Sequence, residues 1–310
     1  MSRLPARAAL PFLLGLTLLL TPPSPAGAEK VPTLAPATNA FGVDLYRALK
    51  GKDGNLFFSP YSVHSALLMA REGARGETAA QMDAVLHTKD LSRGNAWRAD
   101  RTALKPPAFT DGFGKDAKKR PAYEMNVANA IWGQDGFAFE GAFTQSLDQV
   151  FGAPLERIDF KQTEAARERI NGWVEQETRE KIKDIVPKGV LTPMTRMVLA
   201  NAIYFKAPWQ DPFKQRFTKE GTFTGPGGAE SKAPFLPRTG RDPYSEVGGV
   251  QVLERPDRRG AASMLVLLPK AKDGLPALEG ALTAEMVDAL GRKGSLKRRL
   301  VDVRLPKFKY

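Results

Sequence analysis

Apolar residues near the start of the chain recur at helical spacing. Three of them follow Asn39 at intervals of about four residues, which predicts an amphipathic helix that Asn39 caps. Ser59 and Pro60 then supply a cap and a first-turn proline for a second helix. The buried face of that helix is predicted to hold Val63, Ala66, Leu67 and Ala70. The apolar segment 55–58 before it is a short strand candidate.

Helical and strand patterns then interleave along the rest of the chain. Strands are predicted at 123–132, 155–160, 195–206, 251–255, 263–269 and 300–310. Helices are predicted at 96–104, 140–151, 164–181 and 275–290. The segment 195–206 is apolar on both faces, which predicts a central strand covered on both sides. No repeat, Gly/Ser-rich linker or regular βαβ rhythm is visible, so one mixed α+β domain is expected.

The first 28 residues differ from the rest of the chain. Arg3 and Arg7 give a basic start before an apolar run at 8–20, and small residues at 26–28 match a signal-peptidase site. This predicts a secretory signal at 1–28, a Pro-rich lead at 29–38 and a domain at 39–310. No later run reaches the roughly 18 to 20 apolar residues of a membrane helix. A soluble protein in the medium or the periplasm is therefore expected.

The charge and the cysteine content limit the kinds of bonds, nucleophiles and partners that this chain can have. The 310-residue chain has 46 Lys and Arg against 34 Asp and Glu, and no Cys. Disulfides and thiolate nucleophiles are thereby excluded. Basic runs at 118–120 and 297–299 suit either a solvated surface or an anionic polymer.

No enzyme motif is visible. A Ser-His-Asp hydrolase needs a histidine base beside its serine, and His64 and His87 are the only histidines. Both are predicted to lie in helices. The chain has no nucleophile elbow, S-x-x-K, metal-spaced histidines, P-loop or G-x-G-x-x-G. Glu175 and Glu177 lie on a charged helix, where solvated carboxylates are expected. No catalytic residue and no metal ligand is predicted, and a secreted hydrolase stays as a remote alternative, because acid and base carboxylates meet only in the fold.

One stretch carries a more specific signal. "NLFFSPYSVHSALLMAREGARGETAAQM" (55–82) resembles the signature of the serpin family. The matching positions are Asn55, Phe58, Ser59, Pro60, Ser62, Ala66, Leu67, Met69, Gly73, Ala74, Gly76, Thr78, Gln81 and Met82. Further segments are similar in serpin order: "ANAIWGQDGFAF" (128–139), "INGWVEQETREKIKDIV" (170–186), "LTPMTRMVLANAIYFKAPWQDPF" (191–213), "SMLVLLPK" (263–270) and "VDVRLPKFKY" (301–310).

The resemblance implies a metastable protease inhibitor with a large central mixed sheet, surrounding helices and smaller sheets. A target protease cuts an exposed loop, which then inserts into the central sheet as an extra strand. The resemblance places Ser59, Ser62 and Asn201 at the shutter, where the sheet opens, and Trp209 at the breach, where the loop enters. It also places the helix 164–181 across the sheet face.

The resemblance also implies partners. A serine endopeptidase is the expected target, with a cysteine endopeptidase as a second class, no nucleic acid or membrane partner, and a monomeric state. No cofactor is expected, except that an anionic polysaccharide could bind a set of basic residues: Arg98, Arg101, Lys105, Lys118, Lys119 and Arg120.

The chain departs from the family after "LPKFKY". The segments that carry the hinge and the reactive loop in serpins do not follow it, so a C-terminally incomplete fragment of a longer reading frame is expected. A non-inhibitory serpin-fold protein, working as a carrier or chaperone-like binding protein, is the alternative function, and an inactive fragment is another.

Overall fold

The computed structural model describes residues 33–51, 54–111, 117–225, 228–292 and 294–308. The predicted secretory signal lies outside the described residues. The helices are α1 (Ala35–Leu49), α2 (Pro60–Gly73), α3 (Gly76–Val85), α4 (Arg93–Ala103), α5 (Gly141–Phe151), α6 (Thr163–Glu177), the 3-10 helix η2 (Gln215–Phe217), α7 (Leu275–Ala281) and α8 (Ala284–Gly291). The strands are β1 (Ala108–Asp111), β2 (Lys118–Pro121), β3 (Glu124–Gln134), β4 (Leu155–Ile158), β5 (Met197–Lys206), β6 (Lys219–Thr224), β7 (Glu230–Val247), β8 (Val250–Pro256), β9 (Ser263–Pro269) and β10 (Arg298–Pro306). The predicted mixed α+β fold is confirmed.

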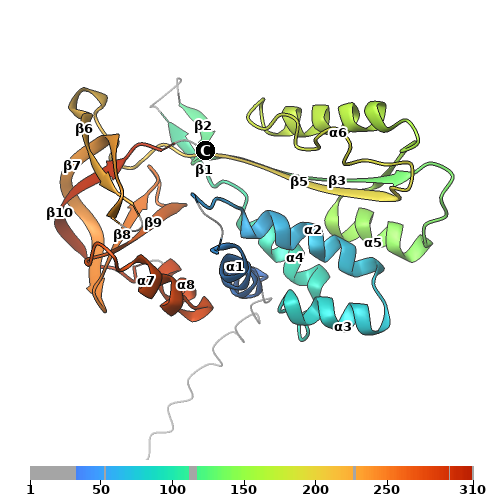
Figure 1. Ribbon diagram of the computed structural model, residues 1–310, viewed down its shortest axis with the longest axis horizontal. Helices are drawn as coiled ribbons and strands as arrows, with labels where there is room; N and C mark the ends of the chain where they lie inside the picture. The colour runs from blue at the N-terminus through green and yellow to red at the C-terminus, as the bar shows by residue number, and fades with distance from the viewer. Residues whose placement is uncertain (1–32, 52–53, 112–116, 226–227, 293, 309–310) are drawn as a thin grey trace, which may run out of the picture. The chain divides into compact units, whose positions relative to one another are not determined.

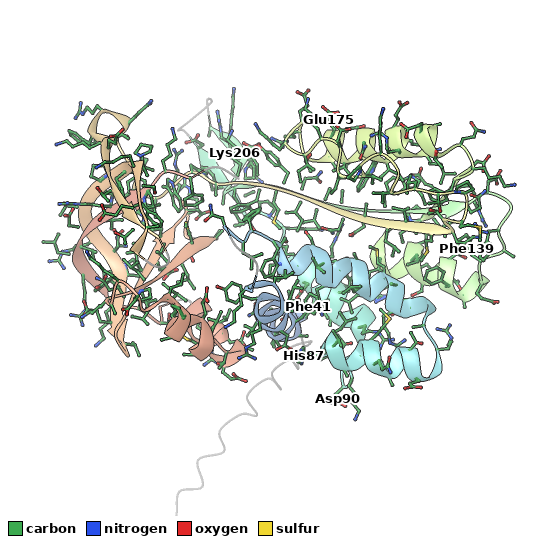
Figure 2. All side chains as sticks on the ribbon, viewed as in Figure 1. Phe41, His87, Asp90, Phe139, Glu175 and Lys206 are labelled. Carbon is green, nitrogen blue, oxygen red and sulfur yellow. The ribbon has the colours of Figure 1, made fainter. Side chains whose placement is uncertain are left out.

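A mixed three-stranded sheet lies between two helical layers. Its order is β4-β3-β5, with β3 parallel to β4 and antiparallel to β5. Figure 1 shows α6 on one face of this sheet and α2 and α5 on the other. Side chains fill the space toward both layers (Figure 2). Leu68 and Met69 of α2 and Ile131 of β3 are buried in the α2 layer, whereas Trp132 and Ile170 are buried in the α6 layer.

Alternation along β5 explains why its sequence is apolar on both faces. Met197 and Leu199 pack against the core of the α2 layer, and Val198 and Ala200 pack against the core of the α6 layer. The predicted two-sided cover is confirmed. The predicted central position is wrong, because β3 is the middle strand and β5 lies at the edge of the sheet in the described part of the chain.

The second sheet has five strands in the order β10-β7-β8-β9, with β6 also paired to β7. The first part of β7 pairs with β6 and β10, and its last four residues pair with β8. In β10, Val303 is buried while Asp302 and Arg304 are exposed, which confirms the alternation read from the sequence. Strands β1 and β2 form a separate hairpin. The sequence patterns predicted none of β1, β2, β6 and β7.

Two predictions near the start of the chain are wrong. Helix α1 starts at Ala35 with Pro36 in its first turn, so Asn39 is not its cap. The Asn39 side chain instead donates to Asp288 of α8 over 2.6 Å. Residues 55–58 form no strand.

Helix α2 starts as predicted but buries other residues. Ser59 caps it by accepting a hydrogen bond from the Ser62 amide over 3.2 Å. Its fully buried side chains are His64, Ser65, Leu68 and Met69, and the four predicted residues are only half-buried. Packing on several sides, against α1, α5 and β5, shifts the core away from the single face that the periodicity indicates.

Three helix ends also differ from prediction. Helix α6 stops at Glu177, where Arg179 and Glu180 take left-handed backbone angles (φ 51° and 60°) that end a helix. The predicted helix 275–290 is two helices, because the Thr283 hydroxyl accepts from the Met286 amide and caps a new one. His87 lies in a turn after α3, with φ 53°.

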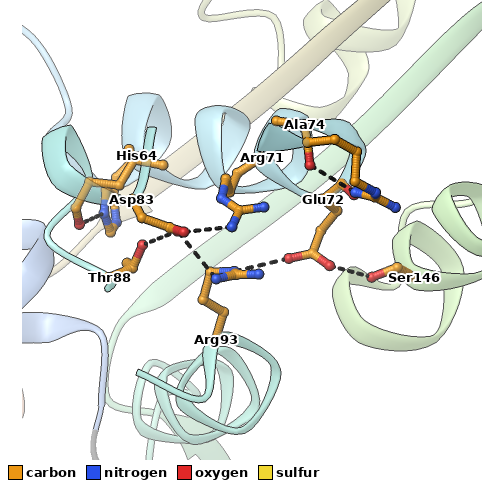
Figure 3. A network of polar contacts seen from close by, with 10 residues as sticks. His64, Arg71, Glu72, Ala74, Asp83, Thr88, Arg93 and Ser146 are labelled. Carbon is orange, nitrogen blue, oxygen red and sulfur yellow. Dashed lines mark hydrogen bonds and ion pairs between the residues drawn. The ribbon is translucent and has the colours of Figure 1, made fainter. Parts of the chain in front are cut away.

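A polar network joins helices α2 to α5 (Figure 3). Asp83 accepts hydrogen bonds from Arg71 over 2.5 Å and from Arg93 over 3.2 Å. Arg93 also binds Glu72 over 3.1 Å, and Glu72 accepts from Ser146 over 2.9 Å. These partly buried charges fix the helices relative to one another.

Among the described residues, no helix is both long and apolar enough to span a membrane.

Candidate functional site

Within the described residues, strand β5 lies at the edge of the first sheet. It pairs with β3 along its whole length, from Met197 to Lys206, and no strand pairs with its other side in the described part of the chain. Both of its faces are covered, by α2 and by α6. An edge of this kind exposes unpaired backbone donors and acceptors, and an extended peptide can add to it as a further strand. The edge of β5 is therefore the candidate site.

Two asparagines face each other across β3 and β5. Asn201 and Asn129 are direct register partners, and Asn201 Nδ2 donates to Asn129 Oδ1 over 2.7 Å. Asn129 Nδ2 and Asn201 Oδ1 are buried and have no partner among the described residues. Each such group costs about 1–3 kcal/mol when left unpaired. The pair therefore retains one donor and one acceptor for a further partner.

The two predicted shutter serines lie at the start of α2. They contact each other through the cap, in which Ser59 Oγ accepts from the Ser62 amide. No hydrogen bond joins either serine to Asn201 within the described ranges. The structure therefore brings the serines together in one turn and places Asn201 on the strand that α2 covers, with Asn129 rather than a serine as its partner.

Trp209 lies three residues beyond the end of β5. It forms an isolated antiparallel bridge with Asp257, and its ring meets Phe213 edge-on at 6.4 Å between centroids. The Arg255 guanidinium lies 5.7 Å from the centre of the same ring. Trp209 is half-buried and belongs to neither of the two main core clusters. It therefore joins the end of β5 to the second sheet.

Helix α6 lies on the sheet face, as the resemblance implies. Ile170 and Val174 are buried beneath it, and the Trp173 ring meets Trp132 of β3 edge-on at 5.4 Å. Its outer face carries charged residues. Glu175 pairs with Lys183 over 2.7 Å, and Glu177 accepts from Asn126 over 2.6 Å. The two carboxylates thus have separate structural partners.

The predicted polysaccharide-binding residues lie on two elements. Arg98 and Arg101 are exposed on α4, and Lys105 is exposed just beyond its end. Their spacing places the three on one side of the helix axis. Lys118, Lys119 and Arg120 form β2 of the hairpin and are exposed, and Arg120 also pairs with Asp111 over 3.3 Å.

The histidines do not form a catalytic pair. His64 is buried, with Nδ1 3.0 Å from Thr38 Oγ1 and Nε2 2.9 Å from the Leu86 carbonyl oxygen. Burial lowers the pKa of His64. His87 is exposed and contacts Asp44 over 2.8 Å. Neither ring forms a hydrogen bond with a serine within the described ranges, and no group of three or more His, Asp or Glu side chains there is placed to hold a metal ion.

Two residues of this region were missed by the sequence patterns. Asn129 falls within the strand predicted at 123–132, and an asparagine among apolar residues indicates a polar partner. Arg255 was assigned only to a strand, and the structure buries its charge beside Trp209. A charged residue in an apolar strand has no visible partner in the sequence, because Asp242 is thirteen positions away.

Comparison with known proteins identifies a family. The sequence model of the family described as "Serpin (serine protease inhibitor)" matches residues 36–310. An uncharacterized serpin-like protein of Thermococcus kodakarensis is 36% identical over 278 residues, which cover 88% of this chain and 61% of that protein. The leukocyte elastase inhibitor of Equus caballus is 35% identical over 289 residues, which cover 89% of this chain and 72% of that inhibitor.

Solved structures agree with this match. Ovalbumin from the emu, Dromaius novaehollandiae, superposes with a TM-score of 0.79 at 26% identity, covering 88% of this chain and 73% of that one. The chain thus spans 61% of the length of the Thermococcus relative and about three quarters of the other two.

Proposed function

Because this chain belongs to the serpin family, we propose that it is a proteinase inhibitor whose targets are serine endopeptidases, with cysteine endopeptidases as a second class. The family description names serine proteases as the targets of its members, and one relative is an elastase inhibitor by name. The proposal assigns no catalytic residue to the chain, because the protease supplies the chemistry and the inhibitor supplies a conformational change.

The free edge of β5 is the observation that carries this proposal. In the proposed mechanism, the protease cuts a peptide loop and remains attached to it, and the loop then adds to β5 as a new strand. The two covering layers would hold that strand between α2 and α6. The unpaired amide atoms of Asn129 and Asn201 are polar groups that the rearranged sheet could satisfy.

Export and a monomeric state are part of the same proposal. The basic, apolar and small-residue pattern of residues 1–28 supports secretion to the medium or the periplasm. N-terminal sequencing of the mature protein is expected to begin at Glu29, and an intact Met1 would contradict this. We further propose that anionic polysaccharide binds the basic residues of α4 and β2.

The test of inhibition is a denaturant-resistant complex. Protein produced from the complete reading frame, including whatever follows Tyr310, is incubated with pancreatic elastase, trypsin, chymotrypsin and papain, and each mixture is run on a denaturing gel. A 1:1 band is expected with at least one protease, and the same protease blocked at its active-site nucleophile should give none. Cleavage without a complex by every protease would contradict inhibition and favour the non-inhibitory binding role.

A further inference from the structure

An arginine is buried at the end of the free strand β5. Arg255 of β8 has a side chain that is 2% exposed. Its guanidinium carbon lies 5.7 Å from the centre of the Trp209 ring and 5.1 Å from that of Phe213. Burial among these rings lowers the pKa of Arg255. The guanidinium is therefore buried against aromatic rings, between the first sheet and the second.

Two directional hydrogen bonds hold this guanidinium. Nη1 donates to Asp242 Oδ1 over 2.7 Å, and Nη2 donates to the Asp211 carbonyl oxygen over 2.6 Å. The Asp242 side chain is also 2% exposed and pairs a second time, with Arg238. Arg238 in turn reaches the Asp211 carboxylate over 3.1 Å. Two arginines and two aspartates thus neutralise one another. We call Arg255, Asp242, Asp211 and Trp209 the Arg255 clamp.

Backbone bonds attach the continuation of β5 to the end of β8 at the same place. The Arg258 amide donates to the Pro208 carbonyl over 2.8 Å, and the Gln210 amide donates to the Pro256 carbonyl over 3.1 Å. The Arg255 bond to the Asp211 carbonyl extends this series by one residue. The segment that leaves β5 is therefore held by three consecutive attachments, of which only one depends on a side chain.

The buried charges of the Arg255 clamp contribute little to the stability of the contact between the two sheets. Within the clamp, Arg255 Nε is buried and has no hydrogen-bond partner among the described residues. Buried ion pairs gain little over apolar packing, because desolvation offsets the attraction. An incompletely satisfied pair is even less favourable. Stability alone thus gives a weak reason for a charge at this position, whereas directional bonding to the Asp211 carbonyl gives a specific one.

We propose that Arg255 is a positioning residue that fixes Trp209 and the end of β5 against β8, and thereby restrains the movement of β5 that strand insertion requires. This inference rests on the proposed inhibitory function. Stacking orients the Trp209 ring, and the bond to Asp211 holds the backbone beyond it. Removing the guanidinium frees the Trp209 ring and the backbone at Asp211. The two backbone hydrogen bonds then hold the segment after β5 alone.

The first experiment measures the clamp itself by amide hydrogen exchange. In the Arg255→Met variant, exchange of the Gln210 and Arg258 amides is expected to accelerate at least tenfold, while the Val252 amide inside β8 keeps its rate. Arg216→Met is the matched control, because Arg216 is exposed and stacks on Phe217 at 4.9 Å. Unchanged exchange at Gln210 and Arg258 would overturn the proposal.

Two further variants separate positioning from simple loss of stability. Replacing the pair by apolar residues in Arg255→Met/Asp242→Leu should restore the midpoint of denaturant unfolding. Exchange at Gln210 should nevertheless stay fast, since the bond to the Asp211 carbonyl is still missing. Arg255→Lys keeps a charge and one donor, and partial protection is expected. Full recovery of protection in the apolar pair would show a purely structural role and overturn the proposal.

The second experiment links the clamp to inhibition. With a protease that forms the denaturant-resistant complex, Arg255→Met is expected to raise the rate of complex formation at least threefold, and Arg216→Met should leave it unchanged. If Arg255→Met accelerates hydrogen exchange but forms the complex at an equal or slower rate, the proposed link between the clamp and strand insertion is overturned. Failure of the product of the complete reading frame to form any complex would instead refute the proposed function, while the exchange result would still decide whether Arg255 fixes the end of β5.

Discussion

The side-chain amide of Asn201 on β5 donates to that of Asn129 on β3, its direct register partner, over 2.7 Å. The remaining donor and acceptor of this pair are buried without partners in the part of the chain described. The pair therefore combines one good hydrogen bond with two unsatisfied groups, and its effect on stability depends on which partner is changed.

Removing one asparagine should be more harmful than removing both. Asn201→Ala leaves the whole amide of Asn129 without a partner, and we expect the free energy of unfolding in urea to fall by about 1–3 kcal/mol. The double variant Asn129→Leu/Asn201→Leu should be close to neutral or stabilising, because no polar group remains buried. The exposed Asn95→Ala serves as the control, with a change within about 0.5 kcal/mol. A double variant that costs as much as the sum of its singles would contradict this account.

The helix network predicts a stability change in acid. The hydrogen bond from Arg71, with smaller contributions from Thr88 and Arg93, holds the pKa of Asp83 below its usual 3.8. Asp83 therefore stabilises the fold fully above pH 3.8, and this contribution is lost as the pH falls through the lower pKa of the folded state. Asp83→Asn should cost about 1–3 kcal/mol at pH 7, and the difference from the unmodified protein should shrink in acid. If the difference in free energy of unfolding between Asp83→Asn and the unmodified protein did not change with pH, this would argue against the ion pair at Asp83. Asp302→Asn, at an exposed pair with Arg304, is the control.

His64 predicts a second pH effect of the same sign in a different range. Because burial lowers its folded-state pKa, the unfolded chain binds a proton more readily below about pH 6.5. Stability should be full above that pH and should fall below it, with a slope of at most about 1.4 kcal/mol per pH unit. His64→Phe is expected to lose this slope between pH 6.5 and 5, and His87→Gln to keep it. Equal slopes in His64→Phe and the unmodified protein would show that His64 is not the source.

Basic residues on α4 and β2 predict binding to a sulfated polysaccharide. The protein should elute from a heparin column at higher salt than a variant with Arg98, Arg101 and Lys105 changed to Gln. A second variant with Lys118, Lys119 and Arg120 changed to Gln tests the hairpin separately. Changing the exposed Lys50, Lys188 and Lys307 to Gln removes the same charge elsewhere. If all three variants elute together, net charge rather than a site explains retention.

The sequence correctly predicted the elements that depend mainly on neighbouring residues. Ser59 followed by Pro60 marks the start of α2, and alternation marks β10, because a cap and a one-sided strand each depend on neighbouring residues. Strand β7 was missed because Pro234, Pro237 and Pro243 interrupt it. The structure accommodates these prolines in a strand that changes partners along its length.

The candidate site depends on longer-range facts. The edge position of β5 among the described residues follows from the order β4-β3-β5. Its one partner there, β3, lies some seventy residues earlier in the chain, as the Asn129–Asn201 contact shows. The role of Arg255 depends on Asp211 and Asp242, which lie 44 and 13 positions away. Periodicity reports the faces of an element and not its neighbours, so these contacts were beyond prediction from the residues alone. The family resemblance supplied Asn201 and Trp209 as candidates, without their partners.

The Asn129–Asn201 contact also bears on how the chain finds its fold. On the apolar α2 side of β3 and β5, Asn201 lies directly opposite Asn129. A slip of two residues would preserve which side chains face α2 but would set Asn201 opposite Val127 or Ile131, leaving both amides buried and unpaired. Apolar neighbours alone would tolerate such a slip. The hydrogen bond between the two amides therefore favours the native register of β3 and β5, and misaligned pairings have a higher free energy during folding.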